Sequence, residues 1–190
     1  MTYTELQVTT NFSFLRGASH PEELVDYAAA LGYTTLSITD RNTVAGVVRA
    51  HAAARKHNLR IIPGCRLDLL DGPSLLAYPS NVQGWANLCS LLSTGNLRAE
   101  KGDCLLYTAD VFQYSTGLQM IVLPPETLTS DFRFDPSFEK ALIGYKTIFK
   151  ENLSLALTRR YNGDDSKQLY RLQQLSQQTG IPLVATNDVH

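Results

Sequence analysis

The sequence predicts an α/β fold in which seven short, parallel strands alternate with outer helices around a distorted barrel. Two observations support this fold class. Short apolar stretches alternate with longer amphipathic ones, and strands joined through helices usually pair in parallel. In addition, no GxGxxG motif follows the first expected strand, which disfavours a dinucleotide-binding sheet. An open doubly wound sheet is the alternative to the barrel.

The expected strands are apolar runs, several rich in β-branched residues and bounded by turn signals. In chain order they cover residues 5–10, 34–40, 60–70, 74–79, 118–125, 152–160 and 181–188. Pro63 has no backbone N–H, so we expect an edge position or a bulge in the third strand. Asp71 and Gly72 form a turn signal before the fourth strand.

The expected helices show a period of 3.6 residues or clear terminal signals. In chain order they cover residues 19–32, 43–58, 81–96, 109–117, 135–146 and 164–180. We expect Ser19 to cap the first helix, Glu22 to complete a capping box and Gly32 to end the helix. In the second helix, Val48 and His51 share the apolar face, which predicts a core position for His51.

Length, charge and cysteine content limit the possible classes of function. At 190 residues the chain suits one domain, and its 44% hydrophobic residues can supply a core. A net charge of −1 excludes a nucleic-acid-binding field over the whole surface. Cys65, Cys89 and Cys104 form neither a zinc motif nor an even set for disulfides, which favours the reducing cytoplasm. No apolar stretch approaches the roughly 20 residues of a membrane span.

The last expected strand ends in Asn187, Asp188 and His190, a carboxylate and an imidazole that look like half of a metal site. In barrels of this class, the chemistry lies at the C-terminal ends of the strands. Polar residues at these ends or in the following loops are Glu5, Gln7, Thr9, Arg16, Asp40, Arg41, Arg66, Asp68, Arg159, Arg160, Asp188 and His190. Each one alone is typical of a solvated strand end, but together they favour a shared polar mouth.

Four motifs resemble the N-terminal PHP (polymerase and histidinol phosphatase) domain of bacterial DnaE-type DNA polymerases, most closely their error-prone branch. They are TELQVTTNFSFLRGASHPEELV, SITDRNTVAGVVRAH, LALTRRYNGDD and PLVATNDVH. The resemblance covers the whole chain and implies a distorted seven-stranded βα barrel of the PHP type. It also implies that residues 1–190 are an excised N-terminal fragment of a longer polymerase. In metal-binding members, histidines and carboxylates at the strand ends hold metal ions that hydrolyse phosphoesters or proofread DNA.

The sequence departs from that metal-binding pattern at most positions. Glu5, Gln7 and Thr9 align with the histidines of the family's HxHxH motif, whereas Asp40 is kept. Arginine replaces a family aspartate, histidine, glutamate and histidine at Arg16, Arg41, Arg66 and Arg160, respectively. Arginine has no lone pair for a metal and stays charged at ordinary pH. We therefore expect a pseudo-site in which guanidinium groups replace the ions and pair with Glu5, Asp40 and Asp188.

Only Asp188 and His190 remain as weak candidates for metal ligands, and no metal is expected because structural zinc takes about four ligands. The pairing of guanidinium groups with carboxylates can be purely structural, or unpaired arginines can leave a site for phosphate. Within the fragment the prediction is a non-catalytic scaffold without nuclease or phosphatase turnover.

The resemblance implies the rest of the function. The parent protein would be a DNA-directed DNA polymerase, a nucleotidyltransferase that acts in damage-tolerant replication and repair, with magnesium in a palm domain outside this chain. Expected partners are the remaining polymerase domains, DNA through the parent protein and other replication or repair proteins, and no membrane. Two alternatives stay open. One is an active PHP phosphoesterase or 3′–5′ proofreading exonuclease, and the other is a non-enzymatic module that binds a protein or the DNA backbone.

Overall fold

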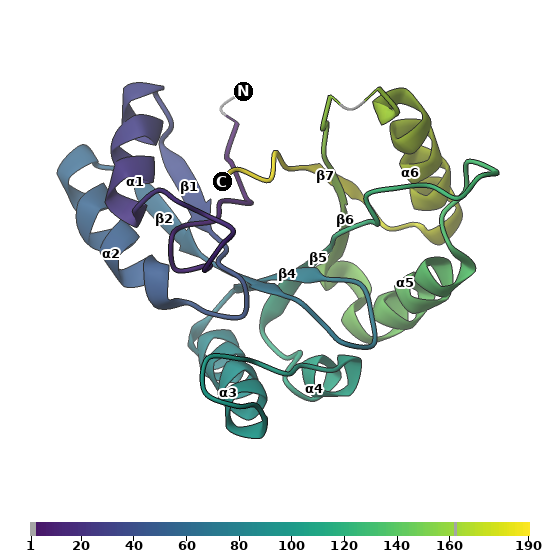
Figure 1. The fold of residues 1–190 in the computed structure, drawn as a ribbon, viewed down its shortest axis with the longest axis horizontal. Helices are drawn as coiled ribbons and strands as arrows, with labels where there is room; N and C mark the ends of the chain where they lie inside the picture. Colours follow the sequence, from purple (N-terminus) through teal and green to yellow (C-terminus); the bar gives the residue numbers. More distant parts are fainter. Residues whose placement is uncertain (1–2, 162) are drawn as a thin grey trace. The chain divides into compact units, whose positions relative to one another are not determined.

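Helices and strands alternate along the chain as the sequence predicts (Figure 1). A computed structural model describes residues 3–161 and 163–190. The chain forms two compact units. The first unit reaches to Leu67 and also contains Thr186–His190, and the second comprises Asp68–Ala185. Within the described residues, no helix is both long and apolar enough to span a membrane.

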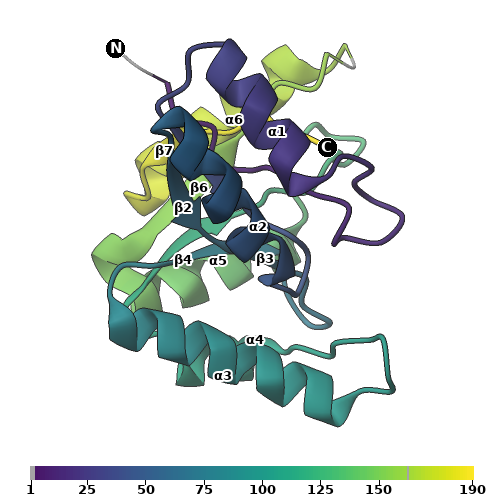
Figure 2. The same ribbon diagram turned by 90° about the vertical axis from the view of Figure 1, so that its left-hand side faces the viewer.

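The first unit packs two helices beside a pair of parallel strands. Its elements are α1 (Pro21–Ala30), β1 (Thr35–Ile38), α2 (Ala45–Ala54), the 3₁₀ turn η1 (Arg55–His57), β2 (Arg60–Pro63) and β3 (Cys65–Leu67). β1 and β2 pair in parallel from Thr35 opposite Arg60 to Ile38 opposite Pro63. α1 and α2 lie side by side (Figure 2), and their small apolar residues join the strands in one buried core.

The expected first strand, residues 5–10, is an extended segment with isolated bridges rather than a regular strand. Glu5 bridges to Leu36, and Val8 bridges to Val189. Some backbone N–H groups of this segment donate to side chains instead of to the carbonyl groups of a neighbouring strand. The N–H groups of Gln7 and Val8, for example, donate to the Glu5 carboxylate (2.9 Å) and the Thr39 hydroxyl (3.0 Å). Polar side chains that bond to nearby backbone compete with sheet formation.

The expected third strand is split at Gly64 into β2 and β3, directly after Pro63. The N–H of Gly64 donates to the Ile38 carbonyl (3.0 Å), and that of Arg66 donates to the Asp40 carbonyl (3.0 Å). The break therefore keeps the segment beside the end of β1. Seven strands are described, as predicted, but β2 and β3 count separately and residues 5–10 do not count.

Two local predictions for the helices were wrong. His20 is the N-cap of α1, and its N–H donates to Glu23 (2.7 Å), because the helix begins one residue later than the Ser19 motif suggested. Glu22 instead accepts a 2.6 Å hydrogen bond from Arg49 on α2. His51 is exposed, because α2 buries Val47, Ala50, Ala53 and Ala54 toward α1 and the strands.

The second unit builds a sheet in the order β4, β5, β6, β7, with helices between the strands (Figure 1). Its elements are β4 (Leu75–Pro79), α3 (Val82–Arg98), α4 (Thr108–Gln113), β5 (Leu118–Val122), α5 (Pro136–Phe149), the 3₁₀ turn η2 (Lys150–Asn152), β6 (Leu153–Leu157), α6 (Asp165–Thr179) and β7 (Leu183–Ala185). β5, β6 and β7 are parallel, which confirms the expected pairing there.

β4 and β5 are antiparallel, contrary to the parallel arrangement expected throughout. α3 leads away from the end of β4, and residues 99–116 then bring the chain back beside the start of that helix. There the Gly117 carbonyl accepts hydrogen bonds from the N–H (2.9 Å) and the hydroxyl (2.9 Å) of Ser80. The chain therefore enters β5 next to the point where it left β4, as in a hairpin with a long connection.

Candidate functional site

Nine of the ten predicted site residues fall within the first unit, and eight of these lie on its strands or bridges or directly beside them. They are Glu5, Gln7, Thr9, Asp40, Arg41, Arg66, Asp188 and His190. Backbone hydrogen bonds from Thr9 N–H to the Val189 carbonyl (2.8 Å) and from Val189 N–H to the Gln7 carbonyl (2.9 Å) join the first of these segments to the last. Arg41 and Arg66 face each other in a parallel bridge between their own segments.

Glu5 is a buried carboxylate whose bonded neighbours are all neutral. It is 3% exposed and accepts hydrogen bonds from the Tyr3 hydroxyl (2.8 Å) and from the N–H groups of Gln7 (2.9 Å) and Asn187 (3.2 Å). Burial, followed by the hydrogen bond to Glu5, raises the pKa of Tyr3 well above its usual range. Both carboxylate oxygens therefore serve to fix the chain around them.

Asp40 is fully buried at the end of β1 and holds the loop that follows residue 9. Its carboxylate accepts hydrogen bonds from the N–H of Thr10 (2.8 Å), the hydroxyl of Thr10 (2.9 and 3.1 Å) and the hydroxyl of Ser13 (2.7 Å). A Cβ at Gly46 would lie 2.4 Å from the Asp40 Oδ2, so α2 has no room for a larger side chain at this position. The expected pairing of Asp40 with arginine is replaced by bonds from neutral donors.

The Asp188 carboxylate lies close to the side chains of Gln7, His190 and Arg66. The Gln7 side-chain amide donates to its carboxylate, and the His190 Nε2 lies 3.6 Å from the same oxygen. An Arg66 guanidinium nitrogen is 4.0 Å from that oxygen, and both side chains are largely buried. At this distance the two groups form an ion pair rather than the charge-assisted hydrogen bond that was expected, and the pseudo-site stays a prediction.

Arg16 and Arg160 have other surroundings. Arg16 is exposed in the loop after residue 10. Arg160 belongs to the second unit, where its guanidinium contacts Glu126 at 2.8 Å and its N–H donates to Asp165 (3.0 Å). Thr9 is 2% exposed, and its backbone N–H takes part in the pairing with Val189.

The donor set does not fit a divalent ion. Among the described residues, no three histidine, cysteine or carboxylate side chains converge as metal ligands. The oxygens of Glu5 and Asp40 already accept hydrogen bonds, and Arg41 and Arg66 cannot donate an electron pair to a metal. A guanidinium beside Asp188 also repels a cation electrostatically.

Sequence reasoning missed Thr10 and Ser13 as the donors that hold Asp40. Their hydroxyl groups are spaced three residues apart in the loop, a pattern typical of Ser/Thr turns. Such turns are common, so this spacing alone indicates no particular partner.

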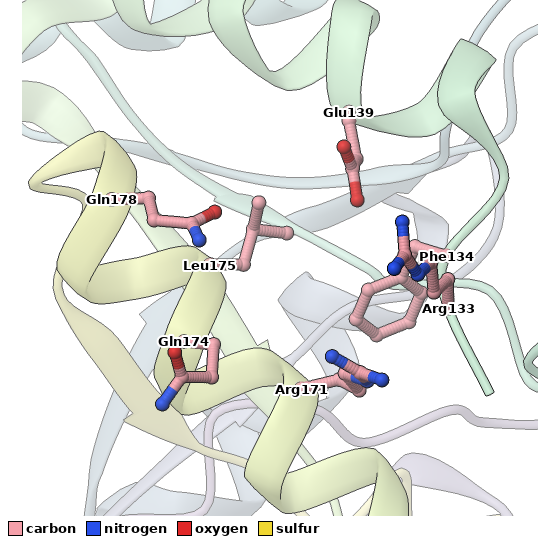
Figure 3. A pocket seen from close by; sticks show the side chains of 7 residues that line it. All are labelled: Arg133, Phe134, Glu139, Arg171, Gln174, Leu175 and Gln178. Atoms are coloured by element: carbon pink, nitrogen blue, oxygen red, sulfur yellow. The ribbon is translucent and has the colours of Figure 1, made fainter.

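The second unit also has a pocket that the sequence did not predict, of about 330 Å³ (Figure 3). Arg133, Glu139 and Arg171 point toward it over a floor that includes Phe134 and Leu175. Arg171 Nε donates to the Phe132 carbonyl (2.6 Å), which holds this arginine against the loop. The pocket is polar and open, and its residues lack the acid–base or nucleophile arrangement of a catalytic site.

Comparisons with known proteins agree with this architecture. A family model described as PHP domain matches residues 5–160. The chain is 48% identical over 188 residues to an error-prone DNA polymerase of Caulobacter vibrioides and 45% identical to one of Sinorhizobium medicae. Both alignments cover 98% of this chain but only 17% and 16% of those relatives. The chain thus spans about a sixth of their length.

Two solved structures share the fold at low sequence identity. One is a crystal structure of a putative metal-dependent phosphoesterase from Bifidobacterium adolescentis, with a TM-score of 0.72 and 15% identity over 100% of this chain and 88% of that chain. The other is an amidohydrolase from Chromobacterium violaceum with bound sulfate and no metal, with a TM-score of 0.68 and 14% identity over 98% and 87%. These likenesses confirm the PHP-type α/β fold.

Proposed function

The chain belongs to the PHP domain family and is homologous to part of the error-prone DNA polymerases, and from this we propose that it is a non-hydrolytic scaffold domain of such a polymerase. The whole protein would extend DNA primers in damage-tolerant replication and repair, in the cytoplasm. It would use magnesium in a polymerase domain outside these residues. Its remaining domains, DNA and other replication or repair proteins would be the partners of this chain.

The proposal rests on the burial and the hydrogen bonds of two carboxylates, those of Glu5 and Asp40. Glu5 and Asp40 are 3% and 0% exposed, and backbone amides and hydroxyl groups bond to the oxygens that would face an ion. Metal-assisted hydrolysis needs a bound ion to acidify water and polarise the phosphoryl oxygen. The residues in place here instead connect the 5–10 segment to the end of β1 and to the last residues of the chain.

Metal content and hydrolysis, measured together, test this proposal. We expect purified protein, incubated with zinc or manganese and then dialysed, to retain far less than one ion per chain by elemental analysis. It should also release no nitrophenol from bis-p-nitrophenyl phosphate and no nucleotide from the 3′ end of DNA. A near-stoichiometric ion together with chelator-sensitive hydrolysis would overturn the proposal and favour the hydrolase alternative.

Two variants make the result specific. Asp188→Ala and His190→Ala remove the remaining candidate ligands, so any ion held by this site must be lost from both. Metal that stays in both variants, without hydrolysis, is bound elsewhere and leaves the proposal intact. Binding of DNA by the chain alone, steeply weakened by salt and by Arg66→Ala, would instead support the backbone-binding alternative.

A further inference from the structure

The loop after the 5–10 segment presents two large apolar side chains to solvent. Phe14 is 84% exposed and Leu15 is 86% exposed, and the exposed Arg16 follows directly. We call Phe14, Leu15 and Arg16 the loop tip. Single exposed apolar residues are ordinary on a protein surface, but here two are adjacent, and phenylalanine and arginine are residue types enriched at protein interfaces.

The backbone under the tip is held in place, so the exposure does not result from a loose loop. The Ser13 N–H donates to the Thr10 carbonyl (3.0 Å), and the Ser13 carbonyl accepts from Arg16 (2.9 Å) and Gly17 (3.1 Å). The hydroxyls of Thr10 and Ser13 both donate to Asp40, which is 0% exposed. The tip is therefore tied to the buried end of β1.

Two features show that the loop has little freedom to turn its apolar side chains inward. Leu15 has a φ of +60°, a conformation that is uncommon for residues other than glycine. A Cβ at Gly17 would lie 2.4 Å from the Thr10 carbonyl oxygen, so the backbone is closely packed there. A rigid loop that displays apolar side chains loses little conformational entropy when a partner covers them.

Neighbouring side chains already have partners, which sets the tip apart from them. Phe12 lies under the Arg49 guanidinium, whose carbon is 5.8 Å from the ring centroid. Arg49 in turn contacts Glu22 at 2.6 Å. Phe12 and Arg49 thus contact partners within the first unit. The side chains of Phe14 and Leu15, in contrast, extend into solvent.

We propose that the loop tip docks into an apolar pocket with a carboxylate at its rim, in the part of the polymerase chain that lies outside residues 1–190. This inference rests on the proposed function. It follows from the length of the relatives, because this chain covers only 16–17% of them and most of a polymerase remains to cover the tip. Phe14 and Leu15 fill the apolar pocket, and Arg16 pairs with the carboxylate.

A protein pocket suits the tip better than DNA does. Binding to a phosphate backbone is built from many lysine and arginine contacts, whereas the tip supplies one cation. Single-stranded DNA binds on series of aromatic rings, and the tip offers one exposed ring followed by an aliphatic side chain. Buried aromatic and apolar anchors with an arginine are typical of protein interfaces.

Site-specific photo-cross-linking in the full-length polymerase tests the proposal. The photoreactive residue p-benzoylphenylalanine is placed at position 14, at position 15 in a second protein, and at position 48 as a control. Val48 is also apolar and 73% exposed in the same unit, but it lies on the regular helix α2. We expect positions 14 and 15 to cross-link within the same molecule to residues beyond 190, at least tenfold more than position 48 does.

Any other result overturns the proposal. Such results are cross-links to residues within 1–190, to primer-template DNA or to a second protein, and a yield no higher than that of position 48. Charge reversal at Arg16→Glu provides an independent readout, because it should lower the yield from position 14 several-fold while circular dichroism stays unchanged. Metal-dependent hydrolysis with the cross-link retained would reject only the proposed function, and loss of the cross-link without hydrolysis would reject only this inference.

Discussion

The Ser13 hydroxyl donates a 2.7 Å hydrogen bond to the buried Asp40 carboxylate, and its oxygen accepts a 2.9 Å hydrogen bond from the Arg41 N–H. The Ser13 side chain thus connects the loop after residue 10 to two consecutive residues that follow β1, Asp40 and Arg41. The sequence predicted that Asp40 would pair with arginine. Here it organises a loop.

Ser13→Ala should therefore destabilise the protein although it removes only one oxygen. The change takes a donor from a fully buried carboxylate and an acceptor from a backbone N–H, and such losses cost about 1–3 kcal/mol. Urea unfolding followed by circular dichroism measures the change in the free energy of unfolding. Ser166→Ala, at an exposed serine of α6, should change it by less than about 0.5 kcal/mol. Equal effects of the two substitutions would contradict this account of Ser13.

The two helical glycines Gly46 and Gly144 should respond oppositely to alanine. A Cβ at Gly46 would lie 2.4 Å from Asp40 Oδ2 and 3.0 Å from Thr10 Oγ1, whereas one at Gly144 in α5 meets nothing within 4 Å. Gly144→Ala should stabilise the protein by about 0.5–1 kcal/mol through helix propensity. Gly46→Ala should destabilise it by about 1–3 kcal/mol, as overpacking does.

Thermal unfolding of the two glycine variants, with the unmodified protein as reference, gives the sign of each effect. A melting temperature raised by both substitutions would show that the Asp40 carboxylate can move away from α2. The proposed role of Asp40 as a fixed support for the loop would then be untenable.

The second unit should lose stability in acid through Asp110. The Arg98 guanidinium donates two hydrogen bonds to its carboxylate (2.6 and 2.9 Å), and these bonds hold the pKa of Asp110 below its usual range. A carboxyl with a lowered folded-state pKa stabilises the protein above its unfolded-state pKa of about 4. That stabilisation is lost as the pH falls through the lowered value.

Urea unfolding at a series of pH values from about 6 to about 2 checks this linkage. Asp110→Asn should be less stable than the unmodified protein near neutral pH, and the difference should shrink as the pH falls below about 4. Asp103→Asn, at an exposed carboxylate, serves as the control. A difference between Asp110→Asn and the unmodified protein that stays constant over the whole range would contradict the prediction.

The sequence predicted the parts of the fold that depend on local pattern. The parallel pairing of β5, β6 and β7 and the positions of the helices are examples, because apolar periodicity and terminal signals lie within short segments. The antiparallel pairing of β4 with β5 could not be predicted this way. It depends on where residues 99–116 return, and a contact such as that of Gly117 with Ser80 has no local signature.

The same division applies to the candidate site. The sequence predicted the alternating polar residues at 5, 7 and 9 and the acidic residues at 40 and 188 at strand ends. Asp40 and Asp188 follow β1 and β7, whereas residues 5, 7 and 9 lie on an extended segment with isolated bridges. Their partners were less predictable. Glu5 and Asp40 use hydroxyl and amide donors rather than arginine, because several neutral donors can surround a buried carboxylate without bringing in another charge that must lose its water.

The pairing of Val8 with Val189 joins two segments that are synthesised far apart in time. The first unit takes its final segment from residues 186–190, so the backbone partners of Gln7 and Thr9 do not exist until more than a hundred further residues have been synthesised. Contacts so distant in sequence form slowly, because the intervening loop must close first. Until then, this early segment can make only its contacts with β1, such as the bridge from Glu5 to Leu36, and its side toward Val189 stays open.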